Sequence, residues 1–137
     1  MLHLLLLGRS PYTGNITFSD YCQTHLLLAP IHNIKRFAHI LLTTSSTSAF
    51  YKAFKNLFGN ILLFIPIGLF FPALFRHQRK FGYFLLTTTL LIACIETLQL
   101  ILWLGYAETD DIILNDLGAS FGFACWAWKQ RFFPNRG

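Results

Sequence analysis

The chain has 137 residues, of which 54% are hydrophobic and only 12% are charged. An ordinary soluble domain carries about twice that share of charged residues and could not bury so much apolar surface, so the composition excludes one and favours a small protein embedded in lipid. The net charge of +5 indicates contact with anionic lipid headgroups, and no basic, aromatic-interleaved pattern suggests a nucleic-acid partner.

The cysteines give no sign of a structural framework. The three of them, Cys22, Cys94 and Cys125, are odd in number and far apart in the sequence. A disulfide framework needs paired cysteines, and a metal site needs ligands at short, regular spacing. We therefore expect no disulfide framework, no metal site and no cofactor.

Residues 1–25 are predicted to hold a short apolar segment and a polar loop. Leu2–Leu7 is apolar but far shorter than the roughly 20 residues that span a bilayer, and it lacks the basic leader and cleavage site of a signal peptide. We interpret it as the truncated end of a first helix. Arg9–Asp20 contains Pro11 and Gly14, which are typical of a loop.

Two amphipathic stretches follow this loop. The first has apolar residues at helical spacing, at Ile31, Ile34, Ala38 and Leu41, with polar and charged residues between them. That pattern predicts an interfacial amphipathic helix. The hydroxyl-rich run Thr43–Ser48 is expected to end this helix, and the same pattern resumes from Phe50 to Phe58.

Three apolar segments are predicted to cross the membrane: Asn56–Phe75, Gly82–Leu104 and Asp111–Trp128. The first contains Pro66, Gly68 and Pro72, which remove backbone donors or loosen a helix, so we expect a kinked or partly unwound span. The predicted fold is an all-α membrane protein, a small helical bundle with three transmembrane helices, a truncated N-terminal apolar segment and an interfacial amphipathic region.

Basic residues set the expected orientation of the bundle. A compact basic loop, Arg76–Lys80, joins the first two spans, and residues 129–137 form a basic tail after the third. Because short basic loops are retained in the cytoplasm, both are predicted to be cytoplasmic and Gly105–Asp110 is predicted to be an external turn. The basic residues of the two amphipathic stretches would then lie on the outer side of the membrane, so the difference in positive charge between the two sides is small.

Six acidic or amide residues fall in the outer half of the predicted spans: Asn60, Glu96, Gln99, Asp110, Asp111 and Asn115. An acid buried in a bilayer is costly, so such residues need partners, water or a function. At about 1.5 Å of rise per residue, Glu96, Gln99 and Asn115 lie roughly 6 to 12 Å below the outer surface, so we expect them to converge on one level. This predicts a polar pocket between the spans that opens outward.

Each member of this group also has a structural interpretation. Asp110 and Asp111 could be the N-cap and first turn of the last helix, where carboxylates accept hydrogen bonds from unpaired N–H groups. Glu96 could make a single helix–helix hydrogen bond. Gln99 and Asn115 could be hydrogen-bonding groups that hold two helices together.

Other residues of the last segment are expected to pack or to face solvent. Gly118 and Gly122 form a small-xxx-small face, which predicts close approach of a neighbouring helix. Glu108 is expected to be a solvated loop acid, and Asp116 is expected to point away from the Asp111–Asn115 face.

Three motifs resemble those of the VanZ-like family of bacterial membrane proteins. They are Asn60–Gly68, Ile95–Gln99 and Asp110–Gly118, and they occur in the family's order. The resemblance covers residues 26–128, which we interpret as one VanZ-like domain. It implies a small multi-pass protein of the bacterial plasma membrane, in a family whose namesake is associated with resistance to the glycopeptide teicoplanin.

The chain departs from the family's pattern at one position. Several members have an arginine just after the glycine before the acidic motif, where this chain has Tyr106. The nearest permanent cation to the acidic motif must then come from elsewhere, with Arg9, Lys35 and Arg36 as candidates. We therefore expect no pairing of the acids with an arginine at this position.

Three classes of function are open. The favoured one is a binding or shielding protein whose outward pocket holds a membrane lipid, a lipid-linked cell-wall precursor or a lipoglycopeptide. The second is a membrane-embedded enzyme that uses Glu96, Asp110 and Asp111 as acid and base on a lipid-linked substrate, although the chain has no nucleophile–base pair, zinc motif or phosphate-cradling glycine loop. The third is an accessory subunit of a larger membrane complex.

Overall fold

The computed structural model describes residues 17–27, 30–104 and 107–132. The predicted apolar segment Leu2–Leu7, Arg9 and Tyr106 lie outside these ranges. In chain order the elements are α2 (Phe18–His25), β1 (Leu26–Leu27), α3 (His32–Thr43), α4 (Thr47–Leu74), the 3-10 helix η1 (Arg76–Arg79), α5 (Phe81–Ile101), β2 (Ala107–Glu108) and α6 (Thr109–Phe132). The architecture is all-helical, because the strands amount to one parallel pairing of two residues each.

Helix α2 was not predicted, since this part of the chain was assigned in part to a polar loop. Thr17 is its N-cap, and the Thr17 hydroxyl accepts a hydrogen bond from the backbone N–H of Asp20. Threonine followed three residues later by an acid is a helix-start signal that the sequence contained. Tyr21 is fully buried, with its ring 4.3 Å from that of Trp103 beyond the end of α5. This contact holds α2 against the end of α5.

The break between the two amphipathic stretches is confirmed. Helix α3 ends at Thr43 and α4 begins at Thr47. The second stretch and the first predicted span form one continuous helix, α4, which passes through both Pro66 and Pro72. The expectation of a partly unwound segment is therefore wrong, and a bend at these prolines stays a prediction. Close packing of α4 on α6 at Gly68 supports the helix beside Pro66.

Two helices of the described chain, α4 and α5, are long and apolar enough to cross a membrane. The predicted span Gly82–Leu104 corresponds to α5 within a few residues. The predicted span Asp111–Trp128 is helical as part of α6, but α6 does not meet the same criterion. Its first two turns carry three aspartates and an asparagine, which lower its hydropathy. Two clear candidate spans are thus found where three were expected.

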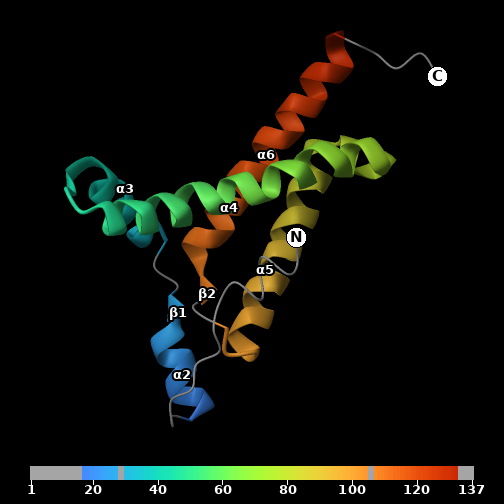
Figure 1. Ribbon diagram of the computed structural model, residues 1–137. Coiled ribbons are helices and arrows are strands. Elements are labelled where there is room, and N and C mark those ends of the chain that lie inside the picture. The colour runs from blue at the N-terminus through green and yellow to red at the C-terminus, as the bar shows by residue number, and fades with distance from the viewer. Residues whose placement is uncertain (1–16, 28–29, 105–106, 133–137) are drawn as a thin grey trace.

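Helix α6 packs along α4 and also against α5 (Figure 1). Gly118 lies against Ile61 and Gly122 lies against Ile65, so α4 and α6 run in the same direction. Helix α5 runs against them, because Phe84 contacts Phe123 near the end of α6 whereas residues further along α5 contact its earlier turns. This serpentine order brings the end of α4, the start of α5 and the end of α6 to one side.

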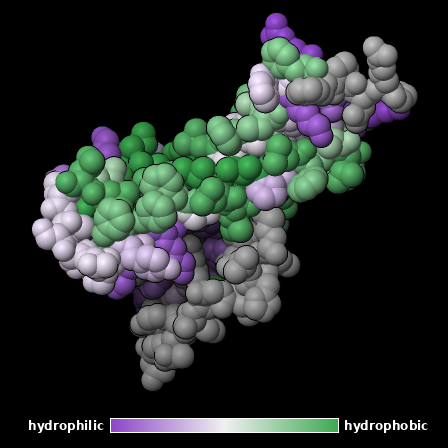
Figure 2. Space-filling view, turned by 45° about the horizontal axis from the view of Figure 1, so that its top comes forward, coloured by the Kyte–Doolittle hydropathy of each residue, from purple (hydrophilic) through white to green (hydrophobic). Residues whose placement is uncertain are grey.

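The core is small and the outer surface is strongly apolar. Phe64, Ile67, Phe84, Ile92 and Ala119 form the buried cluster between the three long helices. Many large apolar side chains of α4 and α5 remain exposed, and Figure 2 shows the hydrophobic flank that they form. Exposed apolar surface of this extent marks a surface that meets lipid or another protein.

Candidate functional site

Asp110 does not cap its own helix but the start of a different one. Its two carboxylate oxygens accept hydrogen bonds from the backbone N–H groups of Ile31 and Ile34, at the N-terminus of α3, the latter at 2.9 Å. Asp110 is only 3% exposed. A carboxylate at this position satisfies unpaired N–H groups and meets the positive end of the α3 dipole. Asp110 was expected to cap the last helix, α6, if its role was structural. It does cap a helix, but that helix is α3.

This capping also explains how the acid is accommodated without an arginine at position 106 of the chain. The donors to Asp110 are neutral backbone groups at a helix start, whose aligned peptide dipoles act like a partial positive charge. Lys35 and Arg36 are exposed on α3, and neither is needed to explain the burial of Asp110. Ile31 holds a left-handed φ of 66°, which is strained for a β-branched residue, and its bond to Asp110 helps to hold it there.

Asp111 and Asp116 connect α6 to two further helices. The Asn60 side-chain amide of α4 donates to Asp111 Oδ1 at 2.6 Å, and Asp111 is 2% exposed. The Thr89 hydroxyl of α5 donates to Asp116 Oδ2 at 2.7 Å. The prediction that Asp116 points away from the Asp111 face agrees with this arrangement, because one acid faces α4 and the other faces α5. Its partner Thr89 was not foreseen.

Glu108 is not the solvated loop acid that was expected. The Asn33 side-chain amide of α3 donates to Glu108 Oε2 at 2.8 Å, and Glu108 is half-buried whereas Asn33 is buried. Glu108 lies in the short pairing of β2 with β1, which brings it beside the start of α3. The acids from Glu108 to Asp116 therefore connect α6, and the residues just before it, to α3, α4 and α5 through hydrogen bonds.

Small residues let α4 and α6 approach closely below this acidic segment. A Cβ atom added at Gly118 would lie 2.0 Å from the Ile61 carbonyl oxygen, and one at Gly122 would lie 2.2 Å from that of Ile65. Gly68 of α4 is equally tight against the Ala119 carbonyl, at 2.0 Å. The predicted packing face is therefore found, and Gly68 belongs to it. Only glycine permits this backbone contact.

Glu96 and Gln99 are buried on α5, at 5% and 1% exposure. Helix α5 contacts β2, just before the start of α6, and the antiparallel run from the Thr89–Asp116 contact brings Glu96 toward the same region. That Glu96, Gln99 and Asn115 converge on one level stays a prediction.

Asn115 is the most distinctive member of the group. It is 2% exposed, and its side-chain oxygen has no hydrogen-bond donor among the residues that the structure describes. A buried acceptor without a donor costs roughly 1 to 3 kcal/mol. Asn115 follows Asp111 by one helical turn, so both lie on the face of α6 that packs on α4. A water molecule or a ligand donor at this position would satisfy it.

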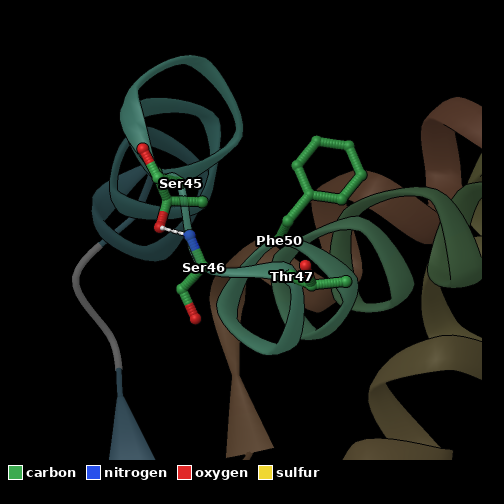
Figure 3. Close-up of a pocket in the computed structure, with 5 residues that line it drawn as sticks. Ser45, Ser46, Thr47 and Phe50 are labelled. Carbon is green, nitrogen blue, oxygen red and sulfur yellow. Dashed lines mark hydrogen bonds between the residues drawn. The ribbon is translucent and has the colours of Figure 1, made fainter.

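A separate hollow lies at the turn between α3 and α4. Figure 3 shows it lined by Ser45, Ser46, Thr47 and Phe50, with Thr44 as the fifth lining residue, and its volume is about 200 Å³. The Ser46 backbone N–H donates to the Thr44 hydroxyl at 3.2 Å. This hollow holds none of the six predicted site residues. Across the described ranges, no three His, Cys, Asp or Glu side chains are placed to hold a metal ion.

The fold and the site define a class of protein. It is a small, all-helical, membrane-type protein in which acidic residues at the start of the last helix form hydrogen bonds to the neighbouring helices. A family model described as VanZ/LLP1 matches residues 1–130. The chain belongs to the VanZ/LLP1 family, and the match also takes in the first 25 residues, before the motifs that carried the resemblance. Comparison with curated proteins finds no match, and neither does comparison with solved structures.

Proposed function

We propose that this VanZ-like protein is a multi-pass protein of the bacterial plasma membrane that binds or shields a lipid, a lipid-linked cell-wall precursor or a lipoglycopeptide. The binding site is the polar group at the start of α6, and its occupation contributes to resistance to teicoplanin. The observation that carries this proposal is the buried Asn115 oxygen, which has no donor in the described part of the chain. A bound molecule with an N–H or O–H group would supply one.

The chemistry of the group favours a donor-rich ligand. Asp111, Glu96 and the Asn115 oxygen all present acceptors, so hydroxyl, amide or amine groups of a sugar or peptide fit them, whereas a phosphate would be repelled by the carboxylates. The exposed apolar flanks of α4 and α5, including Leu62, at 61%, and Leu90, at 62%, would take an acyl chain beside the polar group. Amphiphilic ligands combine these two features.

Replacing Asn115 with leucine separates binding from structure. If Asn115 meets a ligand, Asn115→Leu is expected to lower the affinity for teicoplanin about tenfold, the worth of one hydrogen bond. The same change removes a buried amide oxygen that has no donor among the described residues, so the free energy of unfolding is expected to stay constant or to rise. Affinity is measured by calorimetry on the purified protein in lipid nanodiscs, and stability by thermal unfolding of the same samples.

Ser120→Ala, on the same helix, is the matched control and is expected to leave both quantities unchanged. Unaltered teicoplanin affinity in Asn115→Leu would remove the support for binding at this group. A large loss of stability would instead assign Asn115 to helix packing.

We further propose that α6 is a third span and that the C-terminus lies in the cytoplasm. The serpentine order of α4, α5 and α6 brings the basic residues of η1 and of the last turns of α6 to one side, and the positive-inside rule would assign that side to the cytoplasm. Lys52 and Lys55, near the start of α4, would then lie on the other side. In a chain from which the native cysteines have been removed, a thiol at His77→Cys is expected to react only from the cytoplasm and one at Ser45→Cys only from outside. Labelling of intact cells with a membrane-impermeant maleimide measures this, and the reverse pattern would overturn the orientation.

An enzyme that acts on a lipid-linked substrate is the second candidate, because a buried glutamate on an apolar span is a functional residue by default. Glu96 is then the acid or base, and Asp110 is the weaker candidate since both of its oxygens already accept backbone hydrogen bonds. Turnover of a lipid-linked precursor that is lost in Glu96→Gln, with teicoplanin binding retained, would favour catalysis over shielding.

A further inference from the structure

The end of the molecule opposite the acidic segment gathers basic side chains from two distant parts of the sequence. The ring of Phe81 lies 5.3 Å from that of Phe123, so the start of α5 adjoins the last third of α6. Residues just before Phe81 and residues after Phe123 therefore lie at one end. We call this the basic end, and its members are Arg76, His77, Arg79, Lys80, Lys129 and Arg131.

These side chains are accessible to a ligand. All six are exposed, and Figure 2 shows hydrophilic residues gathered at the upper right end of the molecule, beyond the apolar flank. The loop that carries four of them is held in place, because Arg79 Nε donates to the Pro72 carbonyl at 3.3 Å and Gln78 Nε2 donates to the Thr87 hydroxyl at 3.1 Å. An ordered loop loses less entropy when it binds a ligand.

Aromatic rings surround the basic end. Phe75, Phe81, Trp128 and Phe132 are exposed by 56%, 48%, 65% and 58%. An exposed tryptophan ring such as that of Trp128, beside basic side chains, is typical of the level where lipid headgroups meet acyl chains. The combination therefore fits the interface of a bilayer better than it fits free solution.

Acidic residues are absent from the basic end. Five of the six acids of the chain lie between Glu96 and Asp116, at or near the start of α6. The basic end carries no Asp or Glu between Arg76 and Lys80, nor between Lys129 and Arg131. A phosphate group would therefore be attracted to this end with no carboxylate beside it in the sequence.

We propose that the basic end is a binding site for the phosphate groups of anionic phospholipids, with the loop before α5 and the last turns of α6 as its two arms. Guanidinium and ammonium groups donate to phosphate oxygens, and the neighbouring aromatic rings cover the upper acyl chains. The site is independent of the acidic group at the other end and of the ligand proposed for it.

Lipid binding is tested on the purified full chain in detergent micelles. Both ends of the protein are accessible in a micelle, so the orientation of the protein in a bilayer cannot affect the result. Native mass spectrometry counts bound phosphatidylglycerol, cardiolipin or zwitterionic phosphatidylcholine. Two double variants each remove two charges from one arm: Arg76→Gln with Lys80→Gln, and Lys129→Gln with Arg131→Gln. Arg79 is kept, because it also bonds the end of α4.

The control pair is Lys52→Gln with Lys55→Gln, which removes the same charge from exposed positions near the start of α4. Each arm variant is expected to lower the affinity for anionic lipid about thirtyfold, and the control by less than twofold, with thermal unfolding unchanged in all three. Equal losses in the control pair would assign the effect to net charge alone and overturn the proposal. Equal binding of phosphatidylcholine by the unaltered chain would also overturn it.

Discussion

Gly118→Ala is expected to destabilise the protein by about 3 kcal/mol, because overpacking of a tight interface costs that much when backbone must move. The added Cβ would lie 2.0 Å from the Ile61 carbonyl oxygen and 2.9 Å from the Ile61 Cα. Both are backbone atoms of α4, so no side chain can rotate away, and the two helices must separate. The free energy of unfolding is measured by titrating the purified protein with sodium dodecyl sulfate in mixed micelles.

Gly59→Ala is the matched control, since it makes the same chemical change in a helix of the same bundle. No heavy atom lies within 4 Å of the Cβ that it would add. Alanine has a higher helix propensity than glycine by about 1 kcal/mol in aqueous helices, so this variant is expected to keep or slightly raise the stability. Similar losses in both variants would show that glycine is needed for reasons other than the α4–α6 contact.

Asp110→Ala is expected to release α3 from the bundle. The change leaves the N–H groups of Ile31 and Ile34 without their carboxylate, and the loss of two part-buried hydrogen bonds to a charged group is expected to cost about 2 to 4 kcal/mol in total. Because the loss falls on the start of α3, it is expected to appear as faster amide hydrogen exchange in His32–Thr43 and as faster tryptic cleavage after Lys35 and Arg36.

Asp110→Asn keeps one acceptor oxygen and is expected to show about half of this effect. Asp20→Ala serves as the control, because Asp20 is exposed and its side chain bonds only to neighbouring Thr17 among the described residues. Unchanged hydrogen exchange of α3 in Asp110→Ala would show that this carboxylate is not the cap of α3. A uniform loss of protection in all helices would show that the acid supports the whole bundle.

Asp110 illustrates what local reasoning misses. The two helix starts, at Ile31 and at Thr109, were each visible in the sequence, and one alternative for the acids at the second was that they cap that same helix, whereas Asp110 caps α3. Its partner helix lies 79 residues away in the chain, and hydrophobic spacing carries no information on such a distance. The Thr89–Asp116 and Asn33–Glu108 bonds were missed for the same reason.

By itself the sequence determined the all-helical class, two of the three predicted apolar spans, the break after Thr43, the packing role of Gly118 and Gly122 and the family. These follow from composition, short-range periodicity and local motifs, which are properties of neighbouring residues. Only the tertiary structure decided which helix each acid of α6 contacts, that Glu96 and Asn115 are buried within the bundle, and that the basic segments share one end. Those features depend on the direction and register of α4, α5 and α6, which are fixed by contacts between residues far apart in the chain.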